Sequence, residues 1–207
     1  MAQSRYCYPG TDVLINKLDI QDQETLNNFE RMHTGLRALE LQENPIKGDF
    51  DLKHLQQIHK YLFQDIYEFA GEIRQEDIAK DNFMFAPCRF IEGASQDIFK
   101  NLQREDFKKM DVEKFSDRLA YHVAEINILH PFREGNGRST RIFAEHLAQA
   151  SGYNLEWNRV DKEQLLEASK RSVANHKPLA EAIDQCIVNR ERDRSLMRQF
   201  EDRGLER

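Results

Sequence analysis

Apolar residues recur at spacings of three and four along most of this 207-residue chain, which is the pattern of helices that bury one face. One stripe follows Asp49 or Asp51, either of which can cap a helix, and stops near Gly71. Two more flank Pro131, and the second of them ends at Gly152. The four stripes are Leu26, Phe29, Met32, Leu36 and Leu39; Leu52, Leu55, Ile58, Leu62, Phe63, Ile66 and Phe69; Phe115, Leu119, Val123 and Ile126; and Ile142, Phe143 and Leu147.

The rest of the chain continues this helical pattern. Further turns start at Leu165, and Pro178 precedes a last expected helix that reaches Ile187. Short connections between one-faced helices predict an all-α fold in one compact domain, for which 40% hydrophobic residues supply a core. Residues 189–207 hold six arginines and five acidic residues, so we expect a charged helix or tail there.

One segment, at about 77–90, departs from the helical pattern. Lys80-Asp81-Asn82 is a polar, turn-like run, and Phe83 and Phe85 follow it two residues apart. Period-two spacing beside such a turn favours a short β-hairpin. The two phenylalanines are equally consistent with a loop that contributes to the core.

Composition excludes several classes of function. A formal net charge of −6 argues against a broad nucleic-acid interface, which needs clustered positive charge. No secretory signal and no apolar run of about 18 residues is present, so we expect a cytoplasmic protein without a membrane span. Cys7, Cys88 and Cys186 fit neither a metal site nor a disulfide framework.

The run from His130 to Arg141, His-Pro-Phe-Arg-Glu-Gly-Asn-Gly-Arg-Ser-Thr-Arg, carries the chemistry. Its two glycines permit a tight turn, and the N–H groups at the start of the following helix form an anion site suited to phosphate. Arg138 and Arg141 lie three apart and so share a helix face, which suggests a polyphosphate ligand. Individually, each feature also has a structural explanation, such as an i,i+4 pair between Glu134 and Arg138.

Glu134 and His130 complete the expected chemistry. A carboxylate beside a phosphate repels it unless a divalent cation lies between them, so Glu134 is the candidate Mg²⁺ ligand. His130 ends a helix, whose dipole favours the imidazolium, yet it is also the nearby group that can accept a proton at pH 7. Together these residues predict a phosphoryl- or nucleotidyl-transfer site.

The run resembles the signature of the Fic family, His-Pro-Phe-x-(Asp/Glu)-Gly-Asn-Gly-Arg-x-x-Arg, and matches every defined position. Upstream, Tyr8-Pro9-Gly10 and residues 58–74 are also similar, so that the resemblance covers most of residues 6–188. It implies a Fic-type helical domain over 6–188, with an active-site loop at 130–141 and a β-hairpin flap. Phe69 stands where Trp is common, a departure that we expect to affect packing.

The resemblance also implies a role for each motif residue. His130 would deprotonate the target hydroxyl, Phe132 would be buried to hold the loop, and Glu134 would bind Mg²⁺ between the α- and β-phosphates of ATP. The nucleotide-binding set would be Asn136 on the α-phosphate, Gly135 and Gly137 through their backbone, Arg138 on the β-phosphate and Arg141 on the γ-phosphate.

The hairpin resembles the flap of this family, which clamps the target segment as an added strand. The resemblance therefore assigns Lys80, Phe83, Met84 and Phe85 to target docking or to anchoring of the flap.

Gly137 favours one reaction among those of the family. The branch resembling Doc has lysine there and transfers the γ-phosphate, whereas glycine follows the pattern of AMP transfer to a protein hydroxyl. Protein phosphorylation, or transfer of another nucleotide or phosphate-containing group, is the alternative. An inert scaffold is disfavoured because His130, Glu134 and Arg138 are all present.

Regulation can also be inferred from the resemblance. Many members carry an inhibitory (Ser/Thr)-x-x-x-Glu-(Gly/Asn) helix whose glutamate pairs with the second motif arginine. No serine or threonine of this chain has a glutamate four residues later. The resemblance therefore implies a bacterial toxin that a small separate antitoxin covers at Arg141, with a type II topoisomerase subunit as a candidate target. A constitutively active enzyme, or part of a longer secreted effector, is the alternative.

Overall fold

The computed structural model describes residues 3–80 and 83–203, and it confirms the all-α prediction. Within those residues there are eight helices and one two-stranded hairpin. The helices are α1 Gln23–Glu43, α2 Leu52–Phe63, α3 Ile91–Gln103, α4 Val112–Leu129, α5 Asn136–Ala150, α6 Lys162–Arg171, α7 Lys177–Cys186 and α8 Arg194–Arg203, and the strands are β1 Ala79–Lys80 and β2 Phe83–Met84. None of these helices is long and apolar enough to cross a membrane.

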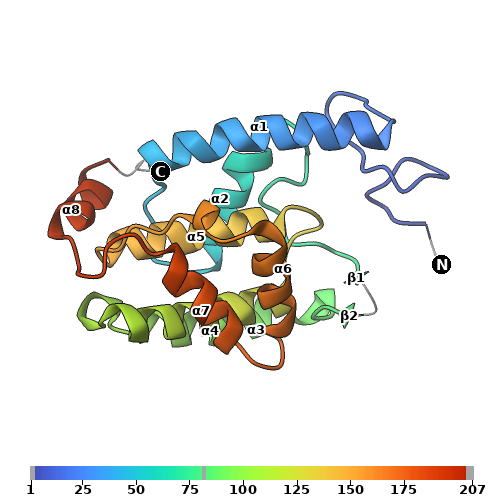
Figure 1. Ribbon diagram of the computed structural model, residues 1–207. Helices are drawn as coiled ribbons and strands as arrows, with labels where there is room; N and C mark the ends of the chain where they lie inside the picture. The colour runs from blue at the N-terminus through green and yellow to red at the C-terminus, as the bar shows by residue number, and fades with distance from the viewer. Residues whose placement is uncertain (1–2, 81–82, 204–207) are drawn as a thin grey trace.

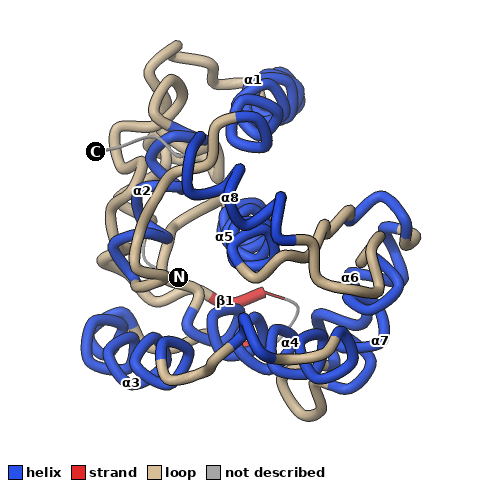
Figure 2. Tube along the Cα trace, turned by 90° about the vertical axis from the view of Figure 1, so that its left-hand side faces the viewer, coloured by secondary structure: helices blue, strands red, loops and turns tan. Residues whose placement is uncertain are grey.

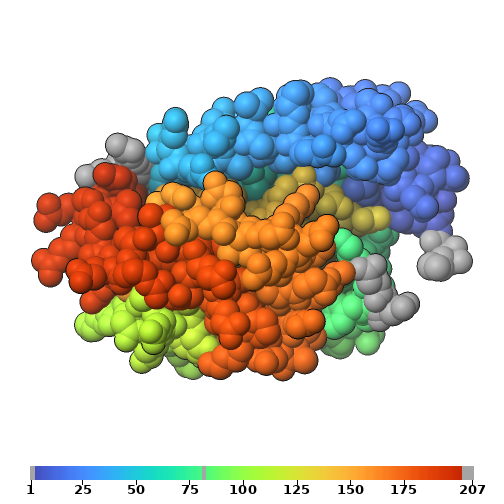
Figure 3. All heavy atoms as spheres, viewed as in Figure 1, coloured from blue at the N-terminus to red at the C-terminus, as the bar shows by residue number. Residues whose placement is uncertain are grey.

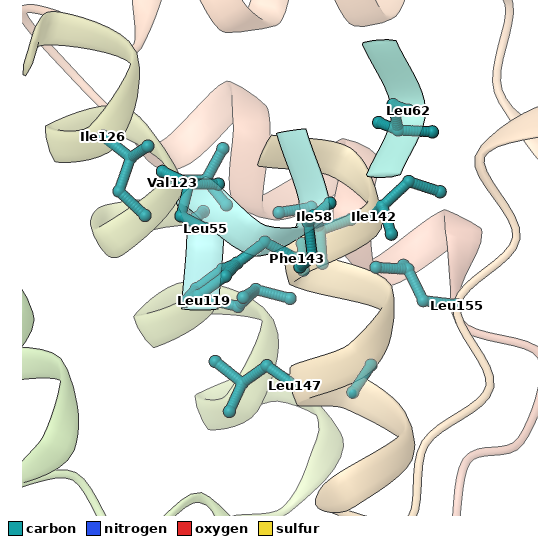
Figure 4. Close-up of a cluster of buried hydrophobic side chains, with 14 of the residues drawn as sticks. Leu55, Ile58, Leu62, Leu119, Val123, Ile126, Ile142, Phe143, Leu147 and Leu155 are labelled. Atoms are coloured by element: carbon teal, nitrogen blue, oxygen red, sulfur yellow. The ribbon is translucent and has the colours of Figure 1, made fainter. Parts of the chain in front are cut away.

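Helix α5 lies at the centre of the molecule, with α1 and α2 on one side and α3, α4 and α7 on the other (Figures 1 and 2). It packs against α2, α4 and α8, while α4 packs against α7. Figure 4 shows the core where α2, α4 and α5 meet, built from apolar side chains such as Leu55, Leu119 and Phe143. The turn from His130 to Gly135 enters α5 directly, so a largely buried helix positions it.

The first predicted stripe forms helix α1, but only its first two residues, Leu26 and Phe29, pack into the core. Met32, Leu36 and Leu39 are 57%, 55% and 59% exposed, and the buried face instead carries Glu30 and Thr34 along with leucines. The prediction was therefore wrong about the direction of this helix. The reason is tertiary, because the polar face of α1 meets charged groups at the start of α5.

Helix α2 begins as predicted and ends early. The Asp51 side chain accepts a hydrogen bond from the His54 N–H, which makes it the N-cap. The helix stops at Phe63 rather than near Gly71, and residues 64–71 form turns that still bury Ile66, Tyr67 and Phe69. The apolar spacing continues beyond Phe63 because the helix and the turns that follow it face the same core.

The remaining expected elements are present, with one addition. Helices α4, α5, α6 and α7 occupy their expected regions. Helix α3 was not predicted. The charged C-terminal segment includes α8, whose Phe200 is buried against Phe50 and His146. Residues 204–207 of that predicted segment lie outside the described residues.

The hairpin is present where it was predicted. Ala79 pairs with Met84 and Lys80 with Phe83 in antiparallel register. Its expected turn residues, 81 and 82, lie outside the part of the chain that the structure describes. Ala86 at the end of the hairpin donates to the Ile128 carbonyl of α4, which ties the flap to the active-site turn.

Candidate active site

The turn between α4 and α5 places two opposite helix ends side by side. His130 caps the C-terminus of α4 with a left-handed backbone, φ 46°, and Gly135 caps the N-terminus of α5 at φ 78°. The yellow atoms of this segment lie directly below the blue atoms of α1 in Figure 3. The first turn of α5 thus directs backbone N–H groups and the positive end of the helix dipole at this turn, although the Gly135 N–H donates to Glu134 and the Ser139 N–H to the Gly135 carbonyl. Phosphate binding at this helix end stays a prediction.

Buried contacts hold the turn in shape. Phe132 is fully buried, as predicted, and its ring stacks on His59 at 3.9 Å. His59 Nδ1 accepts from the Gly71 N–H, so its Nε2 carries the proton and donates to the Glu134 carbonyl at 2.9 Å. Burial lowers the pKa of His59 to about 4, which keeps this ring neutral.

Asn136 closes the same turn with its side chain. The amide accepts from the Phe132 N–H at 2.9 Å and donates to the Phe132 carbonyl at 2.7 Å. The side chain is only 4% exposed. The structure thus gives Asn136 a loop-closing contact that the sequence did not indicate, while its predicted contact with the α-phosphate stays a prediction.

The two motif glycines have different reasons to be glycine. A Cβ on Gly135 would lie 2.2 Å from the Phe63 ring, in a backbone conformation that side chains disfavour. A Cβ on Gly137 would meet only Arg141 Nη1, at 3.4 Å. The fold therefore requires Gly135, whereas Gly137 leaves open space beside an arginine at the start of α5.

His130 has the arrangement of a general base. Its Nδ1 is 3.2 Å from the Asn127 carbonyl, which can only accept, so Nδ1 carries the proton and Nε2 keeps a free lone pair. The Phe85 ring stacks on the imidazole with centroids 3.7 Å apart. Burial lowers the pKa of His130 to about 4, so the expected helix-dipole preference for the imidazolium is outweighed and the ring is neutral at pH 7.

A buried arginine joins the base to the flap. Arg74 is 2% exposed and donates to the His130 carbonyl at 2.8 Å and to the carbonyls of Glu76 and Ala86. Its backbone N–H donates to the Pro131 carbonyl at 2.9 Å. One guanidinium therefore satisfies carbonyls at the end of α4 and at the end of the hairpin, and fixes the two relative to each other.

Charged groups gather on the other side of the turn. Arg138 Nη2 lies 2.6 Å from Glu30 Oε1 and 3.2 Å from Glu134 Oε1. Arg138 also donates to the Thr34 hydroxyl at 3.3 Å and lies over the Phe63 ring at 4.8 Å. The pair between Glu134 and Arg138 is thus present, within a larger cluster that reaches to α1.

Arg141 differs from Arg138. Its side chain is exposed and makes no hydrogen bond or ion pair within residues 3–80 and 83–203. Its Nη1 is near Gly137, so the guanidinium lies over the start of α5. The structure therefore places the two predicted phosphate-binding arginines at the same helix end, one tied to α1 and one available.

The flap residues divide between two environments. Phe85 contacts His130, and Phe83 packs edge-on against Phe85 at 5.3 Å. Met84 is 63% exposed and Lys80 is exposed. The hairpin thus lies beside the base, with one part of it anchored and the other part open to solvent.

Several residues of this site were not predicted from the sequence. Glu30 and Thr34 were overlooked because the apolar stripe suggested that the opposite face of α1 is buried. Arg74 was quoted only as part of the resemblance, and Tyr67 was not assigned a role. The spacing of Glu30 and Thr34, one helical turn apart, was an available signal, but nothing in the sequence indicated that this face meets α5.

Comparisons with known proteins point to one family. The Fic/DOC family matches residues 49–148. Protein adenylyltransferase VbhT of Bartonella schoenbuchensis is 42% identical over 86% of this chain, which spans 37% of that protein. The probable protein adenylyltransferase Fic of Escherichia coli is 38% identical over 89% of this chain and 92% of its own length.

A solved structure has the same fold. The N-terminal Fic domain of a VirB-translocated Bep effector protein from Bartonella quintana, with bound ADP, superposes with a TM-score of 0.82 at 25% identity. The match covers 93% of this chain and 97% of that one. On its sequence relatives and its fold, this chain belongs to the Fic/DOC family.

Proposed function

We propose that this chain is a protein adenylyltransferase, which transfers AMP from ATP to a hydroxyl of another protein. The observation that carries the proposal is the turn itself, where a neutral His130 with a free Nε2 lies beside a helix N-terminus and two arginines. The relatives named protein adenylyltransferase and the ADP-bound neighbour support the same activity.

The reaction assigns a step to each part of the turn. The hydroxyl oxygen attacks the α-phosphorus, its proton passes to His130 Nε2, and the bond from the α-phosphorus to the bridging oxygen breaks to release diphosphate. The N–H groups at the start of α5, together with Asn136, would stabilise the α-phosphate. Arg138 would hold the β-phosphate and Arg141 the γ-phosphate.

Glu134 fits a magnesium site. Its side chain is 42% exposed, and Mg²⁺ commonly binds through one carboxylate together with substrate phosphates. The ion would neutralise charge on the α- and β-phosphates. Glu134 would exchange its contact with Arg138 for the ion.

The flap would dock the target. A two-stranded hairpin has unpaired edges that can accept an extended segment as a further strand. Lys80, Phe83 and Met84 would contact that segment, and Phe85 would keep the flap against His130. Variants that introduce proline into the paired strands, such as Lys80→Pro, should abolish target modification but leave ATP binding intact.

Labelled ATP tests the activity. The purified chain with Mg²⁺ and ATP labelled on the α-phosphate should transfer label to a protein in bacterial lysate, and mass spectrometry should find AMP on a hydroxyl residue. Label that transfers only from γ-labelled ATP would instead identify a kinase. The same spectra would identify the target, for which a type II topoisomerase subunit is the first candidate.

We further propose that a separate small antitoxin inhibits the enzyme. Two observations support this proposal: Arg141 is exposed and makes no hydrogen bond or ion pair within the described residues, and the printed sequence contains no inhibitory motif. A helical peptide containing Ser/Thr-x-x-x-Glu-Gly should inhibit AMP transfer, and a peptide with alanine in place of that glutamate should not. Equal inhibition by both peptides would contradict the proposal.

A further inference from the structure

Glu30 on α1 and Tyr67 in the turn after α2 form a buried pair against a motif arginine. One carboxylate oxygen of Glu30 accepts from Arg138 Nη2 at 2.6 Å, and the other accepts from the Tyr67 hydroxyl at 2.5 Å. Glu30 is 9% exposed and Tyr67 is 2% exposed. The carboxylate is therefore held on both oxygens in a place where water cannot replace its partners.

The remaining contacts fix the plane of the guanidinium. Thr34, one helical turn after Glu30, accepts from Arg138 Nη1 and donates its own hydroxyl to the Glu30 carbonyl at 2.7 Å. Phe63 lies under the guanidinium at 4.8 Å. An arginine has five N–H donors, and Arg138 uses three of them within the described chain, so donors remain for a phosphate.

The two carboxylates around Arg138 are not equivalent. The Glu134 side chain is 42% exposed, whereas that of Glu30 is 11% exposed. Glu134 is the residue proposed to bind Mg²⁺, so it would leave Arg138 when the nucleotide binds. Glu30 would stay, because Tyr67 and the packing of α1 hold it in place.

We propose that Glu30, held by Tyr67, is a positioning residue that keeps Arg138 directed at the β-phosphate of the nucleotide. The inference rests on the proposed function of Arg138. Fixing the arginine before the ligand arrives removes the loss of side-chain freedom that binding would otherwise cause. A carboxylate that merely competed with the phosphate for Arg138 would have the opposite effect on affinity.

Binding of ADP and AMP to the full chain, measured by titration calorimetry with Mg²⁺, separates these roles. Glu30→Ala should weaken ADP binding about tenfold and leave AMP binding, which involves no β-phosphate, unchanged. Glu30→Gln keeps an oxygen acceptor of the same shape and should restore most of the affinity. Tyr67→Phe should cause a smaller loss in the same direction, and it tests the inference even where Glu30→Ala does not fold.

A second Tyr–Glu–Arg cluster, formed between α1 and α2, supplies the control. Glu40 accepts from the Tyr61 hydroxyl at 2.9 Å and from Arg37 at 3.0 Å, and its side chain is 51% exposed. Glu40→Ala removes the same chemistry from the surface and should not change the dissociation constant of ADP.

Two results would overturn the inference. The first is a Glu30→Ala variant that binds ADP as tightly as the wild type or more tightly. The second is an equal loss of affinity for ADP and for AMP, which a disturbed fold would cause. A wild-type chain that binds neither nucleotide would instead contradict the proposed function itself, and that outcome is recognised before any variant is compared.

Discussion

His130 and Arg138 lie on opposite sides of one turn, and their surroundings differ in kind. The base is covered by the Phe85 ring and tied through its carbonyl to the buried Arg74. Arg138 is surrounded by the carboxylates of Glu30 and Glu134. The proposed acceptor side of the site is thus defined by apolar cover, and the proposed phosphate side by charge.

The comparison shows how one turn serves two chemical needs. A base must stay neutral, and removing water from around the ring achieves that despite the dipole of the helix that it ends. A polyphosphate needs positive charge, and the start of α5 with its two arginines supplies it. Substitutions on the acceptor side should therefore change the transfer rate and its pH dependence, whereas those on the phosphate side should change nucleotide affinity.

The largest effect is expected at the base. His130→Ala should reduce AMP transfer by a factor of about 10²–10⁴ or more, because it removes the group proposed to accept the proton of the target hydroxyl. Binding of MgATP, measured by calorimetry, should stay within about twofold. A variant that loses ATP binding as well would contradict the separation of the two sides.

Gly135 should give the next largest effect, and Gly137 is its matched comparison. Gly135→Ala places a Cβ against Phe63 at a positive φ, and overpacking plus strain should lower the free energy of unfolding by roughly 2–5 kcal/mol. Gly137→Ala meets only an arginine tip and should unfold like the wild type in urea. If the space beside Gly137 holds phosphate, Gly137→Ala should weaken ATP binding without changing stability.

Arg141 should give an intermediate effect. Arg141→Ala removes a side chain that makes no hydrogen bond or ion pair in the described chain, so the melting temperature should hardly change. The dissociation constant of ATP should rise about 10- to 100-fold, while that of ADP changes less because the γ-phosphate is absent. A large loss of thermal stability would indicate a structural role for this arginine.

The smallest effect at neutral pH is expected at the flap. Phe85→Ala uncovers His130, so the pKa of the imidazole should rise from about 4 towards its ordinary value near 6.5. The base works when neutral. The variant should therefore lose activity as pH falls through about 6.5, where the wild type stays active, with only a few-fold loss at pH 8.

Phe83→Ala is the matched control, because Phe83 contacts Phe85 rather than the imidazole. It should keep the wild-type pH profile. Folding must be checked at each pH, because burial also lowers the pKa of His54 and His146. Their unfolded forms bind protons below about pH 6.5, so the stability of the fold itself decreases as the pH falls.

Local patterns predicted much of this molecule. An N-cap at Asp49 or Asp51, the hairpin before Phe85 and the helix break at Pro131 all follow from short-range chemistry, and the structure contains them, with the cap at Asp51. The end of α2 did not follow, because apolar residues continue toward the same core beyond Phe63 and spacing cannot distinguish a helix from buried turns. Helix α3 was overlooked, although Ile91, Phe99 and Leu102 have helical spacing.

The sequence by itself determined which groups the proposed chemistry uses, because the turn, its glycines and its arginines are contiguous and their spacing sets a shared helix end. Only the tertiary structure decided how those groups are held. The inward face of α1 brings Glu30 to Arg138, and the flap brings Phe85 to His130. These contacts join residues far apart in the chain, so they depend on how the helices pack around α5 rather than on any local pattern.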